Sequence, residues 1–185
     1  MKILCSIALT SALAAGTAQA QEAEAPFIPG LTQQVAAQAL AQPAHFPHGS
    51  QPVEVGRWEF RGNTFSARDF PPGSHMQHPG KRMGTLGLIS YTPFVGARTL
   101  YSCRTNDHLD RFTSRYENCE GHIKEPYIPI LGYIATSQIA GTVPLYRCIR
   151  GGFNPTWADH FDTVDVHCER QSHYTNEEIL GYIWL

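Results

Sequence analysis

Two stretches of this sequence carry the same landmarks in the same order. The first contains LYSCR at 100–104, DRFTS at 110–114, CE at 119–120 and LGYI at 131–134. The second contains LYRCI at 145–149, DHFDT at 159–163, CE at 168–169 and LGYI at 180–183. In both, the cysteine lies seven residues and the closing glycine twenty residues after the phenylalanine. The shared order and offsets indicate an internal duplication.

A weaker third copy precedes these two. It contains RWEF at 57–60, NTFS at 63–66 and LGLI at 86–89, without cysteines. Each copy alternates like short strands, and its Asp or Asn is expected to cap its own turn. The glycine of the closing step suggests a bulge or a close backbone approach. One copy is too small to bury an apolar face alone. We therefore predict an all-β, β-trefoil-like fold over residues 54–185, made of three pseudo-repeats of about 45 residues.

Composition limits the class of protein. The 185 residues suggest one domain with a tail, and the 42% of apolar residues are enough for a packed core. The formal charge of −2 argues against binding to nucleic acid through bulk charge. The 16 glycines and 13 prolines favour turns and short strands over long helices.

The N-terminus resembles an export signal. Residues 1–20 begin with Met1 and the basic Lys2, which are followed by an uncharged apolar run. The segment ends with Ala18-Gln19-Ala20, a small-x-small cleavage pattern. We expect cleavage after Ala20, no membrane span, and a secreted or periplasmic protein. Residues 21–53 are rich in Ala, Gln and Pro and are predicted to be a leader or linker.

Four cysteines remain after the predicted cleavage, which removes Cys5. An even number in an oxidising compartment favours disulfides over a metal site. Four cysteines allow three connectivities, and the equivalence of the two copies favours the symmetric one. This predicts the disulfides Cys103–Cys119 and Cys148–Cys168.

The landmarks resemble a family of secreted repeats of unknown function, whose members carry a run like "PLYR…DHF.T…E…GY". The matching residues here are PLYR at 144–147, DHF at 159–161 and GY at 181–182. Cys119-Glu120-Gly121 resembles a cysteine-bearing branch of the same repeat. The resemblance implies a β-trefoil-like, lectin-like extracellular binding module. The histidine of the motif occurs once, as His160, while Arg111 and Thr64 take its place in the other copies.

A loop in the last copy suggests where a ligand binds. Residues 151–158 are inserted before Asp159 and contain Asn154 and Trp157. A tryptophan face beside directional polar groups suits a sugar, so we predict binding of a glycan or cell-wall polymer. The predicted ligand-binding residues are Trp157, Asn154, Asp159, His160, Asn106, Asp107 and His108. The alternative is that Trp157 folds back to cap the barrel.

Metal binding and catalysis are weakly indicated. The pair His75 and His78 has no third ligand at suitable spacing, so no metal or other cofactor is predicted. The sequence contains no Gly-x-Ser-x-Gly, no His-Glu-x-x-His and no phosphate loop. We therefore favour a binding module. The alternatives are a protease-inhibitor-like trefoil that docks through residues 70–80, and a small cell-wall hydrolase that uses carboxylates near His160.

Overall fold

The computed structural model describes residues 27–41, 44–69, 78–150 and 158–185. Over these residues the fold is all-β, as predicted, with ten strands and one α-helix. The helix is α1 (Gln33–Leu40). The strands are β1 (Pro52–Phe60), β2 (Asn63–Arg68), β3 (Lys81–Ser90), β4 (Ala97–Arg104), β5 (Arg111–Ser114), β6 (Ile123–Lys124), β7 (Ile130–Ala135), β8 (Thr142–Arg150), β9 (Asp159–Thr163) and β10 (Tyr174–Trp184). Two short 3₁₀ turns lie at η1 (Cys119–Gly121) and η2 (Cys168–Arg170).

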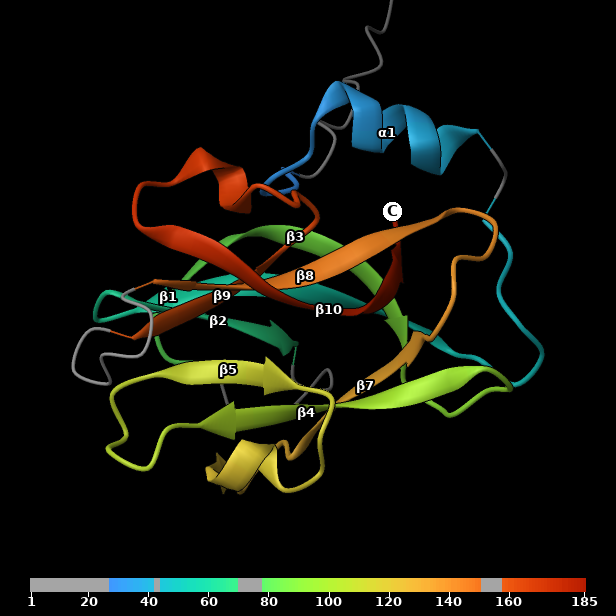
Figure 1. Ribbon diagram of the computed structural model, residues 1–185. Coiled ribbons are helices and arrows are strands. Elements are labelled where there is room, and N and C mark those ends of the chain that lie inside the picture. The colour runs from blue at the N-terminus through green and yellow to red at the C-terminus, as the bar shows by residue number, and fades with distance from the viewer. Residues whose placement is uncertain (1–26, 42–43, 70–77, 151–157) are drawn as a thin grey trace, which may run out of the picture.

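The strands form three antiparallel groups that are consecutive in the chain (Figure 1). In the first group β1 pairs with β2 and β3, in the second β4 pairs with β5, β6 and β7, and in the third β8 pairs with β9 and β10. The groups join through β3, β7 and β10, each of which pairs with the other two. The meeting of these three strands places the apolar core between the groups.

The Leu-Gly pair at the end of each set of sequence landmarks contributes a leucine to that core. Leu86, Leu131 and Leu180 are almost completely buried in one cluster. Each lies at a register shift, where β3, β7 and β10 carry an extra residue relative to their partner strands. The glycine that follows each leucine approaches a main-chain oxygen of a neighbouring strand so closely that a Cβ atom would collide with it. The predicted bulge and close backbone approach at these glycines are therefore confirmed.

Both predicted disulfides are present. Cys103 on β4 is bonded to Cys119 in η1, and Cys148 on β8 is bonded to Cys168 in η2. They close loops with sequence separations of 16 and 20 residues. In the chain-entropy model, a loop of this length stabilises the fold by about 3 kcal/mol.

The described part of the Ala/Gln/Pro-rich segment packs on the strands. Thr32 caps α1 by accepting a hydrogen bond from Val35 N at 3.2 Å, and α1 lies against β8 (Figure 1). The indole of Trp184 donates to His45 O at 3.0 Å. The predicted signal peptide, residues 1–20, lies outside the described residues. Within the part of the chain that the structure describes, no helix is long and apolar enough to cross a membrane.

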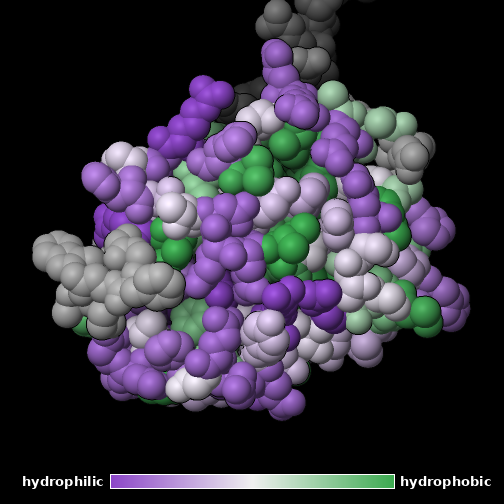
Figure 2. Space-filling view, in the orientation of Figure 1, coloured by the Kyte–Doolittle hydropathy of each residue, from purple (hydrophilic) through white to green (hydrophobic). Residues whose placement is uncertain are grey.

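The surface gives little sign of a large apolar contact area on the side seen in Figure 1. Figure 2 shows polar residues over most of that face, with small separate apolar patches between them. A candidate site on this molecule is therefore better sought in hollows and polar clusters than in an extended hydrophobic patch.

Candidate ligand site between two strand groups

Three polar side chains, Asn63, Asp110 and Asp159, link the strand groups at the start of β2, β5 and β9. Thr64 N donates to Asp159 Oδ1 at 3.2 Å, Arg111 N to Asn63 Oδ1 at 3.2 Å, and His160 N to Asp110 Oδ1 at 3.3 Å. Each side chain therefore caps the backbone of another group, and the three bonds form a cycle. Among the described residues, the side chains of Asn63 and Asp110 do not make the predicted cap of their own turn, while the turn before Asp159 lies outside the described residues. The pattern of one copy could not reveal a contact made between copies.

The amide of Asn63 separates two buried carboxylates. Its Nδ2 donates to Asp110 Oδ1 at 2.6 Å and to Asp159 Oδ1 at 3.3 Å. Burial raises the pKa of Asp159, while hydrogen bonds from the Tyr174 hydroxyl at 2.5 Å and from Thr64 N oppose the rise. A third carboxylate in place of the amide would add repulsion at this point.

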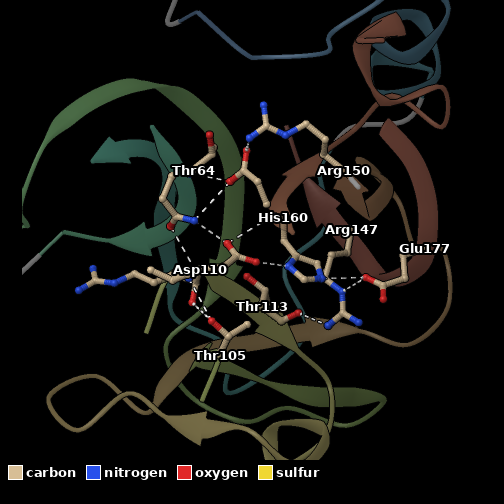
Figure 3. A network of polar contacts seen from close by, with 12 residues as sticks. Thr64, Thr105, Asp110, Thr113, Arg147, Arg150, His160 and Glu177 are labelled. Carbon is tan, nitrogen blue, oxygen red and sulfur yellow. Dashed lines mark hydrogen bonds and ion pairs between the residues drawn. The ribbon is translucent and has the colours of Figure 1, made fainter. Parts of the chain in front are cut away.

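His160 is held between two carboxylates, as Figure 3 shows. Its Nδ1 contacts Asp110 Oδ2, and its Nε2 lies 3.4 Å from Glu177 Oε2. Burial lowers the pKa of His160, but the hydrogen bonds to Asp110 and Glu177 outweigh it and raise the pKa to about 9. The ring is thus protonated at neutral pH with both N–H groups engaged. In that state it has no lone pair with which to act as a base or bind a metal.

Two buried arginines connect the groups through the same set of contacts. Arg57 donates to Asp162 O and to both Glu169 oxygens at 2.5–3.0 Å, and its Cζ lies 4.8 Å from the centre of the Phe161 ring. We call this arrangement of arginine, phenylalanine, main-chain oxygen and glutamate an arginine bridge. This one joins the first group to the third.

The second arginine bridge joins the third group to the second. Arg147 donates to Thr113 O at 2.8 Å and to both Glu120 oxygens at 2.8 and 3.0 Å, with its Cζ 5.3 Å from the Phe112 ring centre. Arg147 is 2% exposed and also contacts Glu177 (2.7 Å) and Glu178 (3.2 Å). Burial raises the pKa of Glu177, but the hydrogen bond from His160 and the charge of Arg147 lower it to about 2.

The third interface, between the first and second groups, lacks an arginine bridge. Within its own strand group, each bridging arginine lies opposite the residue that follows the phenylalanine of that group. Arg57 lies opposite Ser66, and Arg147 lies opposite Asp162. The same register in the second group is held by Ser102, opposite Thr113. The glutamate of each bridge stands ten residues after the capping Asp, and ten residues after Asn63 the sequence has Gly73, outside the described residues. Neither charged partner is therefore present at these positions.

A cavity of about 480 Å³ opens at this interface. Its walls include Phe65, Ser66, His78, Ser102, Arg111, Glu125 and Tyr127. The volume lies within the range of about 300–1,000 Å³ of small-ligand sites. The absence of a long side chain at residue 102 gives a direct reason why this interface is hollow.

The cavity combines ring faces with charged side chains. The Arg111 guanidinium lies 4.9 Å from the Phe65 ring centre, and its Nε is 3.3 Å from Glu125 Oε1. Tyr127 lines the cavity and is 79% exposed. Glu125 Oε1 is buried, and among the described residues none donates a hydrogen bond to it. The site can therefore stack a flat apolar surface and accept a hydrogen bond from a ligand.

The structure divides the residues predicted to bind a ligand. Asp159 and His160 are buried in the polar network. Asn106, Asp107 and His108 form an exposed turn before β5, in which Asp107 accepts hydrogen bonds from the Thr105 hydroxyl and Leu109 N. The remaining two, Asn154 and Trp157, lie outside the described residues, as do residues 70–77 of the predicted docking loop.

Sequence reasoning missed the residues of the cavity. A signal was present, because LYSCR carries a serine where LYRCI carries an arginine. The consequence of that difference depends on the contacts of Arg147 with the neighbouring strand group, which the sequence does not show. Glu125 and Tyr127 belong to a segment without a matching landmark in the other copies.

Metal ligands are not gathered in the part of the chain that the structure describes. No group of three or more His, Cys, Asp or Glu side chains there could hold an ion. His78 packs against Trp58 with ring centres 5.0 Å apart, and its Nε2 lies 2.7 Å from Arg68 O. In comparisons with known proteins, no family model matches this chain, and no curated protein and no solved structure shows significant similarity to it.

Proposed function

We propose that this protein is a secreted, non-catalytic binding module that holds a saccharide unit of an extracellular glycan in the cavity between its first and second strand groups. The observation that carries the proposal is the composition of the cavity. Ring faces, hydroxyl groups and the buried Glu125 Oε1, to which none of the described residues donates a hydrogen bond, line one hollow of about 480 Å³. Sugars present apolar C–H faces ringed by hydroxyls, and small-ligand sites commonly pair apolar walls with a few placed polar groups.

The charges argue against a cationic ligand. Glu125 Oε1 already lies 3.3 Å from Arg111 Nε and 3.8 Å from Arg104 Nε, so a ligand cation would meet two guanidinium groups beside one carboxylate. The exposed ring of Tyr127 offers a surface on which a sugar ring can stack.

The polar network supports a binding role over the hydrolase alternative. Asp159 and Asp162 are buried, and both ring nitrogens of His160 contact carboxylates. Hydrolysis of a glycosidic bond needs two carboxyl groups that face a cleft across the substrate. These carboxylates instead support neighbouring strands.

We further infer that the three strand groups are three repeats arranged as in a β-trefoil. The cyclic caps of Asn63, Asp110 and Asp159 support a pseudo-threefold axis, and so does the recurrence of the Leu-Gly bulge. Export is supported by the pattern of residues 1–20 and by the two disulfides, which persist in oxidising compartments.

The test is a glycan array followed by titration calorimetry with the best ligand. Wild type should bind at least one saccharide, Tyr127→Ala should weaken binding at least tenfold, and Tyr91→Ala should leave it unchanged. Tyr91 is the matched control because it is 52% exposed and lies outside the cavity. Absence of binding to every glycan would overturn the proposal. Binding that depends on Trp157 and not on Tyr127 would overturn the assignment to this cavity.

A further inference from the structure

The two arginine bridges indicate which chemical group fits against the equivalent residues in the cavity wall. In both bridges a planar guanidinium lies over a phenylalanine ring. In both it also donates to the main-chain oxygen of the next residue, Asp162 O or Thr113 O. The third interface keeps the corresponding ring and main-chain residue, Phe65 and Ser66, both of which line the cavity. Ser102 is too short to bring a planar donor to them.

Arg111 does not take the place of the bridging arginine. Arg111 follows Asp110 as His160 follows Asp159, so it corresponds to His160. The ring of Phe112 contacts both His160, at 5.1 Å between ring centres, and Arg147. His160 and Arg147 therefore contact the Phe112 ring at two different places. At the third interface, Arg111 contacts the Phe65 ring at the place equivalent to that of His160. The place equivalent to that of Arg147 is left for a ligand.

Charge decides the chemical class of that ligand. Each bridge contains a cation and a glutamate, and at the corresponding positions of the sequence the chain has Ser102 and Gly73, the latter outside the described residues. Glu125 already contacts two guanidinium groups, with Arg104 Nε at 3.8 Å and Arg111 Nε at 3.3 Å. A ligand cation would therefore add a third positive charge beside one carboxylate. A planar hydrogen-bond donor without charge fits the position, and an amide is such a group.

We propose that the ligand is an N-acylated amino sugar whose amide occupies the place that the arginine guanidinium takes at the other two interfaces. This rests on the proposed function and narrows its substrate class. The amide N–H donates to Ser66 O, the amide plane stacks on Phe65, and the sugar ring lies on Tyr127. A hydroxyl of the sugar donates to Glu125 Oε1.

The first experiment compares three matched probes by titration calorimetry: the β-1,4-linked trimers of N-acetylglucosamine, glucosamine and glucose. The N-acetylated trimer should bind at least tenfold more tightly than either of the others. Equal binding of the N-acetylated and glucose trimers would overturn this inference and leave the proposed function standing. Failure of all three, together with a blank glycan array, would overturn both.

The second experiment fills the proposed place of the ligand amide with a side chain of the protein itself. Ser102→Gln supplies a neutral planar amide on a longer side chain and should reduce binding of the N-acetylated trimer at least tenfold. Arg98→Gln is the matched control and should bind like wild type, because it places the same glutamine on β4 outside the cavity. Circular dichroism and thermal unfolding would show that both variants fold. A folded Ser102→Gln variant that binds with wild-type affinity would overturn the inference.

Discussion

The interface between the second and third strand groups is filled, whereas the equivalent interface between the first and second groups is hollow. At the filled interface Arg147 is 2% exposed and contacts three glutamates. At the hollow one, Ser102 occupies the same register and a cavity of about 480 Å³ lies beside it. Similar strand pairing thus accompanies either a buried ionic contact or an open cavity, depending on the side chain at one position.

The largest expected effect is at the filled interface. Arg147→Ala would leave Glu120, Glu177 and Glu178 close together without their shared cation. Removing one partner of a buried ion pair typically destabilises a protein by about 3–5 kcal/mol, and we expect a loss of that size in the free energy of unfolding. Urea unfolding at pH 7 measures it.

A matched control for this loss is Arg104→Ala. Arg104 lies at the hollow interface, is only partly buried, and is 3.8 Å from its partner Glu125. Its removal should change the unfolding free energy by less than about 1 kcal/mol. Equal losses in the two variants would show that the filled interface is not the stronger one.

A second prediction concerns the pH dependence of the filled interface. The pKa of His160 is about 9 in the folded protein, above the value of about 6.5 expected for an unfolded chain. Its stabilising contribution is therefore complete below about pH 6.5 and is lost as the pH rises through about 9. Between pH 6 and pH 9 the loss should be about 2–3 kcal/mol.

The measurement compares urea unfolding of wild type and His160→Gln at several pH values in this range. The variant begins from a lower stability, but its unfolding free energy should change less with pH because it lacks the titrating ring. Parallel plots of unfolding free energy against pH for the two proteins would mean that folding does not raise the pKa of His160.

The sequence predicted features that lie within one strand group and missed the contacts between groups. The all-β fold, the two disulfides and the close approach at Gly132 and Gly181 follow from landmarks that recur locally. The cap made by Asp110 and the contacts of Arg147 join different groups, and no spacing within one copy encodes them. Ser102 differs from the equivalent Arg147 in the sequence, but the consequence of that difference depends on the neighbouring group.

The same limit explains why His160 was predicted to bind a ligand. In the sequence it is a lone histidine beside an inserted loop, a pattern that suggests a functional side chain. In the structure its ring lies between Asp110 and Glu177, which come from the second and third groups. The two contacts of the ring therefore come from residues that the sequence pattern around His160 does not identify.

The smallest effect is expected at the hollow interface, where Arg111 holds the position of His160. Arg111→His should lower the unfolding free energy by less than about 1 kcal/mol, because the ion pair with Glu125 is only partly buried. The introduced imidazole would face Asn63, a neutral amide, where His160 faces the carboxylate of Asp110. The carboxylate of Glu125 would raise its pKa, but without an Asp at the capping position the rise should be smaller than that of His160, as NMR titration would measure. Adding Asn63→Asp should then raise it further, and a pKa near 9 in the single variant would show that the capping carboxylate is not what separates the two interfaces.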